Sequence, residues 1–287
     1  MGDLAWEYFG GHRIEYKRDP LDGSFSIGRL LGVLRDNRDF RTLYAANAIS
    51  QMGDWLNVVA LFWGTLPSAE PLRHGNPTTT ALIEARAKEA QAKGRPARRN
   101  QHWVPLDRIS IWLVEAVVNS EDARFFEHDG IDETQTRIAL TEALEDGRLG
   151  RGASTITQQL AKNLWLGEER TLWRKLREAI LARRLETLGK NRVLELYLNI
   201  VEWGDGVYGA DAAARVWFGK SAAELLPEEA SILAAMLPAP RKRNPSNPGP
   251  VLRKRSHQIL RLYSVYGELE PEDLAGARWR LEDLLDR

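Results

Sequence analysis

From His102 onward, apolar side chains recur at the spacing of an α-helix rather than of a β-strand. The members of the first such series are Ile109, Trp112, Leu113, Ala116 and Val117. This series places Glu121 at the end of a buried helix. We see no parallel-strand pattern and no phosphate-binding loop in the second half of the chain, so the sequence predicts a mainly α fold.

Three further segments have the same helical period. We expect helices over residues 171–188 and 191–201, and the apolar-rich segment 211–237 is helical until Pro238 and the prolines after it stop it. An exposed helix rich in alanine, lysine and arginine is predicted over residues 81–93. Helices therefore account for most of the regular structure that the sequence predicts.

Composition excludes several classes of protein. The 287 residues are 43% hydrophobic, which suffices for one sizeable globular domain with an extension. The 40 basic and 40 acidic side chains balance, so nucleic-acid binding through bulk charge is not expected. Because the chain has no cysteine, disulfides, zinc-thiolate sites and thiol nucleophiles are excluded together.

The chain divides into five segments by composition. We predict an extension of no assigned role over residues 1–41, a membrane-spanning or interfacial segment over 42–69, and a linker or flap over 70–101. A helical domain is predicted over residues 102–262, and a helical tail over 263–287.

Residues 43–66 form a marginal membrane anchor. Their 24 residues exceed the roughly 20 that a bilayer requires, but Asp54 makes insertion unfavourable by about 2.5 to 3.5 kcal/mol. Four arginines precede the segment and only Arg73 follows it closely, which favours a cytoplasmic N-terminus and an exported domain if the segment spans. A segment packed on the domain or lying in the membrane interface is the alternative.

Two polar stretches, 121–130 and 152–159, are the strongest indication of function. The first combines adjacent carboxylates, aromatic residues and His128, and the second is a run of small hydroxyl and amide side chains. Thr155 and Gln158 have the spacing of a capping box, so a helix start is the structural alternative for them. Capping does not explain why the polar face continues through Gln159 and Lys162, which favours a site that binds and processes a polar substrate.

The segment from Leu160 to Arg192 has nine basic and four acidic side chains, and it indicates an anionic ligand, although a solvated helical face would have the same composition. On a helical wheel of residues 171–188, Leu172 and Trp173 belong to an apolar arc, whereas Lys175 and Glu178 lie opposite with Arg174. The alternative is an exposed helix on which Lys175 and Glu178 form a weak surface pair.

These motifs resemble those of the peptidoglycan glycosyltransferases (the family 51 type), in order and over about half of the chain. The matching residues of the first two motifs are Glu121, Asp122, Phe125, His128, Gly130, Gly152, Ser154, Thr155, Gln158 and Gln159. Those of the last two are Arg174, Lys175, Glu178, Lys190, Glu195, Tyr197 and Asn199. The sequence around these motifs is most similar to that of the monofunctional biosynthetic transglycosylases of Gram-negative bacteria.

The resemblance implies a lysozyme-like, bilobal helical glycosyltransferase domain at the periplasmic face of the bacterial inner membrane. It implies polymerisation of lipid II into a glycan strand by inverting attack of a sugar 4-hydroxyl, with release of undecaprenyl pyrophosphate. Its expected partners are lipid II, the growing strand, the membrane and other proteins of wall synthesis, and its expected cofactor is Mg²⁺ or Mn²⁺ bound with the substrate pyrophosphate. No Ser-x-x-Lys motif occurs, so transpeptidase activity is not expected.

The resemblance also implies roles for single residues. Glu121 matches the general base, and Glu178 matches a second glutamate near the leaving group or its metal. The residues expected to bind substrate or brace the walls of its path are Lys162, Arg170, Arg174, Lys175, Ser154, Thr155, Gln158, Gln159 and Asn199. Asp122 and His128 are expected to be structural.

Two other functions are also compatible with the sequence. A lytic enzyme that cleaves finished wall would also use two carboxylates, but it would not explain the basic helix face. A non-catalytic module that binds anionic lipid would need the basic residues but not Glu121. Replacing Glu121 therefore separates all three interpretations.

Overall fold

The computed structural model describes residues 4–9, 12–17, 42, 45–54, 64–146, 154–167, 171–267 and 269–286. The chain forms two compact units, Met1–Thr65 and Leu66–Arg287. The first unit contains strands β1 (Leu4–Phe9) and β2 (His12–Lys17), which pair antiparallel, and a helical segment over residues 45–54. The sequence indicated no structure for residues 1–41, so this hairpin was not predicted.

The predicted membrane anchor is described only in part, because residues 43, 44 and 55–63 lie outside the described residues. Among the helices that the structure describes, none is both long and apolar enough to cross a bilayer. The anchor over residues 43–66 therefore stays a prediction.

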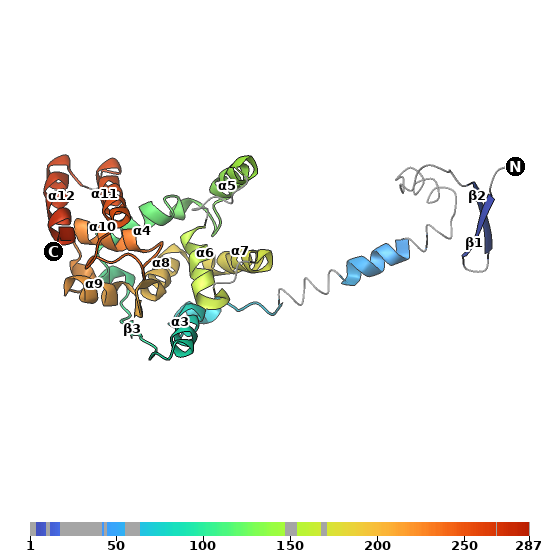
Figure 1. The fold of residues 1–287 in the computed structure, drawn as a ribbon, viewed down its shortest axis with the longest axis horizontal. Coiled ribbons are helices and arrows are strands. Elements are labelled where there is room, and N and C mark those ends of the chain that lie inside the picture. Colours follow the sequence, from blue (N-terminus) through green and yellow to red (C-terminus); the bar gives the residue numbers. More distant parts are fainter. Residues whose placement is uncertain are drawn as a thin grey trace. The chain divides into compact units, whose positions relative to one another are not determined.

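The second unit is built mainly from helices, which confirms the predicted fold class (Figure 1). Its α-helices are α3 (Ala81–Ala92), α4 (Ile111–Glu121), α5 (Glu133–Asp146), α6 (Ile156–Ala161), α7 (Leu172–Glu186), α8 (Lys190–Ile200), α9 (Ala210–Phe218), α10 (Pro227–Met236), α11 (Pro250–Val265) and α12 (Pro271–Asp286). Short 3-10 turns lie at η1 (Glu70–Leu72), η2 (Leu106–Arg108), η3 (Phe125–Glu127) and η5 (Ala222–Glu224), and a π-helical turn, η4 (Lys162–Leu166), continues α6.

Helix α10 forms the centre of the core. Every one of its residues is buried, and it packs against α4, α11 and α12. A helix that is buried on all sides must be surrounded by neighbours, and the polar residues of α10 have partners there, as Glu228 pairs with Arg280 and Glu229 with Lys220. On the other side of the domain, α8 buries Leu194, Tyr197 and Leu198 and packs against α6 and α7. The core thus holds α4 and α6, whose ends carry the two polar stretches, in fixed places.

A small sheet was not predicted. Strand β5 (Val207–Tyr208) lies between β3 (Asn100–Gln101), with which it is parallel, and β4 (Glu202–Gly204), with which it is antiparallel. Each strand is only two or three residues long, too short to show the alternation of polar and apolar residues by which strands are predicted. The sheet joins the segment after α3 to the loop between α8 and α9.

The helix predictions agree closely with the observed bounds of α3, α7 and α8. The prediction of helix throughout residues 211–237 is wrong, because α9 ends at Phe218 before a left-handed Gly219 and α10 begins only at Pro227. The apolar arc of α7 does not face the core, since Leu172 is 89% exposed and Trp173 is 59% exposed. The opposite face, with Glu178, Leu181 and Leu185, is the buried one. The packing of the domain therefore selects a face of α7 that contains a carboxylate.

Gly209 lies in a close-packed turn at the start of α9. Its φ is +85°, and a Cβ there would lie 2.7 Å from the backbone oxygen of Asn199. Gly189, at the start of α8, has a φ of +87° but open space around its Cβ position. The two glycines thus share a backbone conformation and differ in crowding.

We expect Gly189→Ala to lower the free energy of unfolding by about 1 to 3 kcal/mol through backbone strain alone. Gly209→Ala should cost a further 1 to 3 kcal/mol, roughly, because the backbone of Asn199 must also move. Urea denaturation of both variants measures the difference. Equal losses would contradict the proposed close contact.

Candidate active site

Glu121 is the last residue of α4 and the centre of a polar cluster. Its side chain is only 11% exposed, and it accepts hydrogen bonds from Arg255 Nη2 at 2.8 Å and from Gln159 Nε2 at 3.0 Å. The Tyr197 hydroxyl donates to Gln159 Oε1 at 2.9 Å, which fixes the orientation of that amide. Side chains from α6, α8 and α11 therefore converge on one carboxylate.

Burial raises the pKa of Glu121 above its ordinary value, although the hydrogen bond from Gln159 and the charge of Arg255 lower it in part. A carboxylate with a raised pKa is a better proton acceptor, provided that it is still ionised at the working pH. Burial raises the pKa of Tyr197 well above its ordinary range, so its hydroxyl stays neutral and remains a donor to Gln159. The cluster is therefore suited to general-base chemistry.

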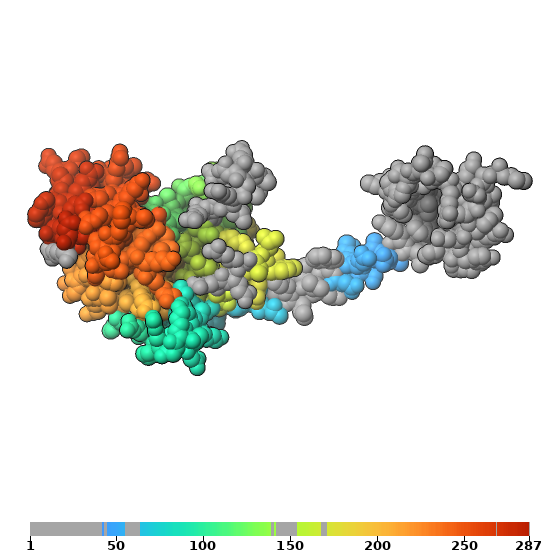
Figure 2. Space-filling model, viewed as in Figure 1, coloured from blue at the N-terminus to red at the C-terminus, as the bar shows by residue number. Residues whose placement is uncertain are grey.

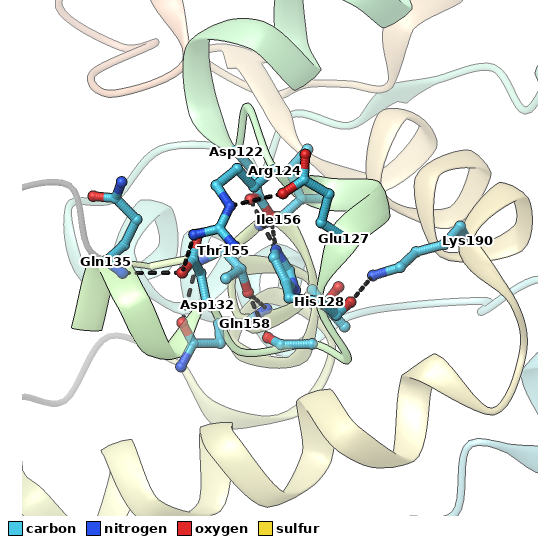
Figure 3. Close-up of polar contacts among 12 residues, drawn as sticks. Asp122, Arg124, Glu127, His128, Asp132, Gln135, Thr155, Ile156, Gln158 and Lys190 are labelled. Carbon is cyan, nitrogen blue, oxygen red and sulfur yellow. Dashed lines mark hydrogen bonds and ion pairs between the residues drawn. The ribbon is translucent and has the colours of Figure 1, made fainter. Parts of the chain in front are cut away.

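Asp122 joins the end of α4 to the start of α6 (Figure 3). Its Oδ2 accepts a hydrogen bond from the backbone nitrogen of Ile156 at 3.0 Å, and its Oδ1 lies 2.9 Å from His128 Nε2. A carboxylate at a helix start satisfies a free N–H group and interacts favourably with the helix dipole. Asp122 and His128 are thus placed as structural supports, in keeping with the roles expected from the sequence.

The structural alternative for Thr155 and Gln158 is confirmed, because the two residues form a capping box at the start of α6. The Thr155 hydroxyl also donates to the carbonyl oxygen of Gly130 at 2.7 Å. Gly130 has a φ of +83°, and a Cβ there would lie 3.1 Å from the backbone of Ala182, so this position requires glycine. Both Thr155 and Gln158 are buried, but only Thr155 also lines the pocket that contains Glu121.

Lys190 and Phe125 complete this support. The ammonium of Lys190 lies 4.5 Å from the centre of the buried Phe125 ring and donates to the carbonyl oxygen of His128. It also pairs with Glu186, whose carboxylate accepts from the Thr157 hydroxyl at 2.6 Å. The first, second and fourth motifs are therefore joined by direct contacts.

Glu178 forms a second charged cluster on α7. It is buried, and its two oxygens pair separately with Arg174 and Lys175. Lys175 and Glu178 do pair, as the alternative of an exposed helix predicted, but Glu178 is only 3% exposed, so the pair does not lie on an exposed helix face. Lys175 is 44% exposed and also donates to the Ser154 hydroxyl at 3.0 Å, so its ammonium remains accessible to an anion.

Ser154 connects the two clusters. It lines the same surface pocket as Glu121, Asp122 and Thr155, and its hydroxyl accepts the hydrogen bond from Lys175. A neighbouring hollow is lined by Gln159, Lys162 and Asn163, and Gln159 contacts Glu121. Glu121 thus lines a pocket that also contains Ser154, and through Gln159 it contacts a hollow that contains Lys162.

Other residues expected at the site are placed away from its surface or are not described. Asn199 is fully buried, and its amide exchanges hydrogen bonds of 2.8 and 2.9 Å with the backbone of Val104. Glu195 accepts a hydrogen bond from the backbone nitrogen of Leu106 at 3.1 Å, so both residues brace the segment before α4. Arg170 and Gly152 lie outside the described residues.

The sequence does not indicate Arg255 and Arg243 as residues of the site, although both act on Glu121. Arg255 is 134 residues from Glu121 in sequence, and the charge of Arg243 also lowers the pKa of Glu121. Both lie beyond the four motifs, in a basic stretch that looks like solvated surface. No local pattern separates them from the arginines beside them, and only the packing of α11 against α4 brings Arg255 to the carboxylate.

Comparison with known proteins identifies the family. The model of the transglycosylase family matches residues 87–263. The chain belongs to this family. Its relatives include biosynthetic peptidoglycan transglycosylases of Nitrosospira multiformis, Thiobacillus denitrificans and an Azoarcus species.

The first of these relatives is 43% identical over 186 residues, which cover 64% of this chain and 81% of the relative. The second is 49% identical over 167 residues, 58% of this chain and 72% of the relative. The third is 42% identical over 221 residues, 76% of this chain and 91% of the relative. The predicted resemblance is therefore confirmed, and this transglycosylase carries Glu121 and Glu178 within the matched region.

The contact between Arg255 and Glu121 generates a pH prediction. Arg255→Met removes a charge that lowers the pKa of Glu121, so the carboxylate should hold its proton to higher pH. We expect the acid limb of the profile of kcat/KM against pH to move to higher pH. Arg253→Met is the matched control, because Arg253 lies on the same helix but pairs with Glu282. An unchanged acid limb, or one that moves to lower pH, would contradict the assignment of Glu121 as the base.

Proposed function

We propose that this transglycosylase polymerises lipid II by transferring the growing glycan strand to the 4-hydroxyl of an incoming saccharide. The observation that carries the proposal is the arrangement of two buried carboxylates in different surroundings. Glu121 has a raised pKa and neighbours that leave it a proton acceptor, whereas Glu178 holds two cations. Ser154 lines a pocket with Glu121 and accepts a hydrogen bond from Lys175 at 3.0 Å.

In the proposed reaction, a carboxylate oxygen of Glu121 accepts the proton of the attacking 4-hydroxyl. The hydroxyl oxygen forms a bond to the anomeric carbon while the bond from that carbon to the pyrophosphate oxygen breaks. The electron pair of that bond leaves with the pyrophosphate. Because attack comes from the face opposite the leaving group, the anomeric centre inverts in one displacement and no glycosyl-enzyme intermediate forms.

In this proposal, Arg174 and Lys175 stabilise the negative charge that grows on the departing pyrophosphate. Donors fixed in place before the reaction stabilise such charge without reorganisation. The buried carboxylate of Glu178 fixes both donors, since each pairs with one of its oxygens. Glu178 is thus a positioning residue for the leaving-group site, and its engaged oxygens argue against a second acid or base of a lytic glycosidase.

The described residues do not form a metal site of their own. No group of three or more histidine, aspartate or glutamate side chains suited to holding a metal occurs among them, and both oxygens of Glu178 are paired with cations. We therefore propose that a divalent cation, Mg²⁺ or Mn²⁺, enters with the substrate pyrophosphate and not as a resident ion.

Glycosyl transfer is the single activity that we propose, because no Ser-x-x-Lys motif for acylation occurs in the 287 residues. The proposed place of action is the periplasmic face of the inner membrane. The exposed apolar residues Leu172, Trp173 and Leu176 support this placement, since an apolar stripe on a helix is suited to a membrane interface. The same helix carries the cations for the leaving group, so the lipid-linked pyrophosphate would meet them at the bilayer surface.

Glu121→Gln tests the proposed function. With labelled lipid II and Mg²⁺, the variant should polymerise at least about 1,000-fold more slowly than the parent, because the proton acceptor is lost. Binding of lipid II should remain, and chelation of the divalent cation should slow the parent enzyme. Glu115→Gln, on the same helix but outside the cluster, is the matched control. Polymerisation by Glu121→Gln at the parent rate would refute the proposal, and release of reducing or anhydro ends from finished wall would favour the lytic alternative.

A further inference from the structure

We propose that a further pocket, which shares Arg86 with the hollow that contains Gln159 and Lys162, binds a carboxylate on the peptide branch of the substrate. This inference rests on the proposed function. The pocket has a volume of about 190 Å³ and lies between α3, the segment after α3, β5 and the segment after α10. Its basic and hydroxyl lining residues are Arg86, Lys93, Arg95, Arg98, Arg241 and Tyr208.

The lining carries an excess of positive charge. Its only acidic members are Glu89 and Asp205, against the five basic side chains. Glu89 accepts hydrogen bonds from two nitrogens of Arg241, at 2.7 and 3.2 Å, and from Lys93 at 2.6 Å. These contacts lower the pKa of Glu89 to about 2, so its charge is already compensated. Arg86 pairs with Glu202 and Arg98 lies 4.0 Å from Asp205, whereas Arg95 has no ion pair among the described residues. The net positive charge of the lining therefore favours an anion from outside the chain.

One residue that lines the pocket, Tyr208, has a hydrogen-bond donor without an acceptor among the described residues. Tyr208 is fully buried, and its hydroxyl has no hydrogen-bond partner among the described residues. A buried polar group left unsatisfied is unfavourable, so such a group indicates a missing partner. Burial raises the pKa of Tyr208 to about 12, and the hydroxyl therefore stays protonated and can donate. A carboxylate oxygen is a suitable acceptor.

The pocket adjoins the active groove. Arg86 lines both this pocket and the hollow that contains Gln159 and Lys162, and Gln159 contacts Glu121. The surface of α3, teal in Figure 2, borders the orange surface of the C-terminal half, where Arg241 pairs with Glu89. A molecule whose sugars lie beside Glu121 can therefore place a side branch in this pocket.

The chemistry of the lining favours a carboxylate. Arg86 already pairs with the buried carboxylate of Glu202 at 3.0 Å. Arg241 donates from two nitrogens to the carboxylate of Glu89, which is the bidentate geometry by which arginine binds carboxylates. The pyrophosphate of the substrate is assigned to Arg174 and Lys175, on a different helix. The remaining anionic groups of a wall precursor are the carboxylates of its peptide.

The test compares two lipid-linked substrates, one with free peptide carboxylates and one in which these are amidated. Tyr208→Phe removes only the unpaired hydroxyl, and Arg95→Ala removes an exposed cation, so neither should prevent folding. For the free-carboxylate substrate we expect each variant to raise KM about tenfold, with kcat within about twofold of the parent. With the amidated substrate the parent should itself show the raised KM, and the substitutions should add nothing.

Tyr266→Phe and Arg108→Ala are the matched controls, because both residues are exposed and lie outside this pocket. Equal effects of the substitutions on both substrates would overturn the assignment and indicate that the pocket binds a phosphate or acts only structurally. Unchanged KM values in both variants would overturn it as well. Failure of the parent to polymerise either substrate would instead refute the proposed function, so the two failures are distinguishable.

Discussion

The carboxylate of Asp122 is the contact on which the geometry of the site depends. Its hydrogen bond to the backbone nitrogen of Ile156 joins the residue after Glu121 to the first turn of α6, three residues before Gln159. The same carboxylate contacts His128 and so fixes the turn that follows α4. The buried carboxylate of Asp122 thereby helps to hold Glu121 and the amide of Gln159 within hydrogen-bond distance of each other. The buried side chains of α8 and α10 keep both helices in place.

Glu121 and Glu178 are both buried but have different surroundings, and the different roles that we propose for them rest on this difference. Burial makes the charged form of Glu121 less favourable, and Gln159 and Arg255 offset only part of this effect. Glu178 is buried as well, but each of its oxygens pairs with a cation. A carboxylate of the first kind accepts a proton readily, while one of the second kind holds positive charge where a leaving group departs. The difference lies in partners and not in residue type.

Several helices and the start of α6 could be predicted from the sequence. The period of apolar residues indicates the helices, and Thr155 and Gln158 have a recognisable capping pattern. Glu121 and Glu178 were identified from their motifs. Long-range packing could not be predicted: Arg255 reaches Glu121 across 134 residues of sequence. Burial of Asn199 and exposure of Leu172 likewise depend on which face of a helix finds a neighbour. The short parallel pairing of β3 with β5 leaves no periodic signal.

The protonation equilibrium of Glu121 itself is the most direct measure of its role. Carbon-13 labelling of glutamate carboxyl groups, with Glu121→Gln to assign the signal, allows this side chain to be titrated by NMR. We expect the signal that is lost in the variant to titrate above the ordinary glutamate value of 4.5 and to coincide with the acid limb of activity. Titration at or below 4.5, or at a pH unrelated to activity, would contradict the assignment of Glu121 as the general base.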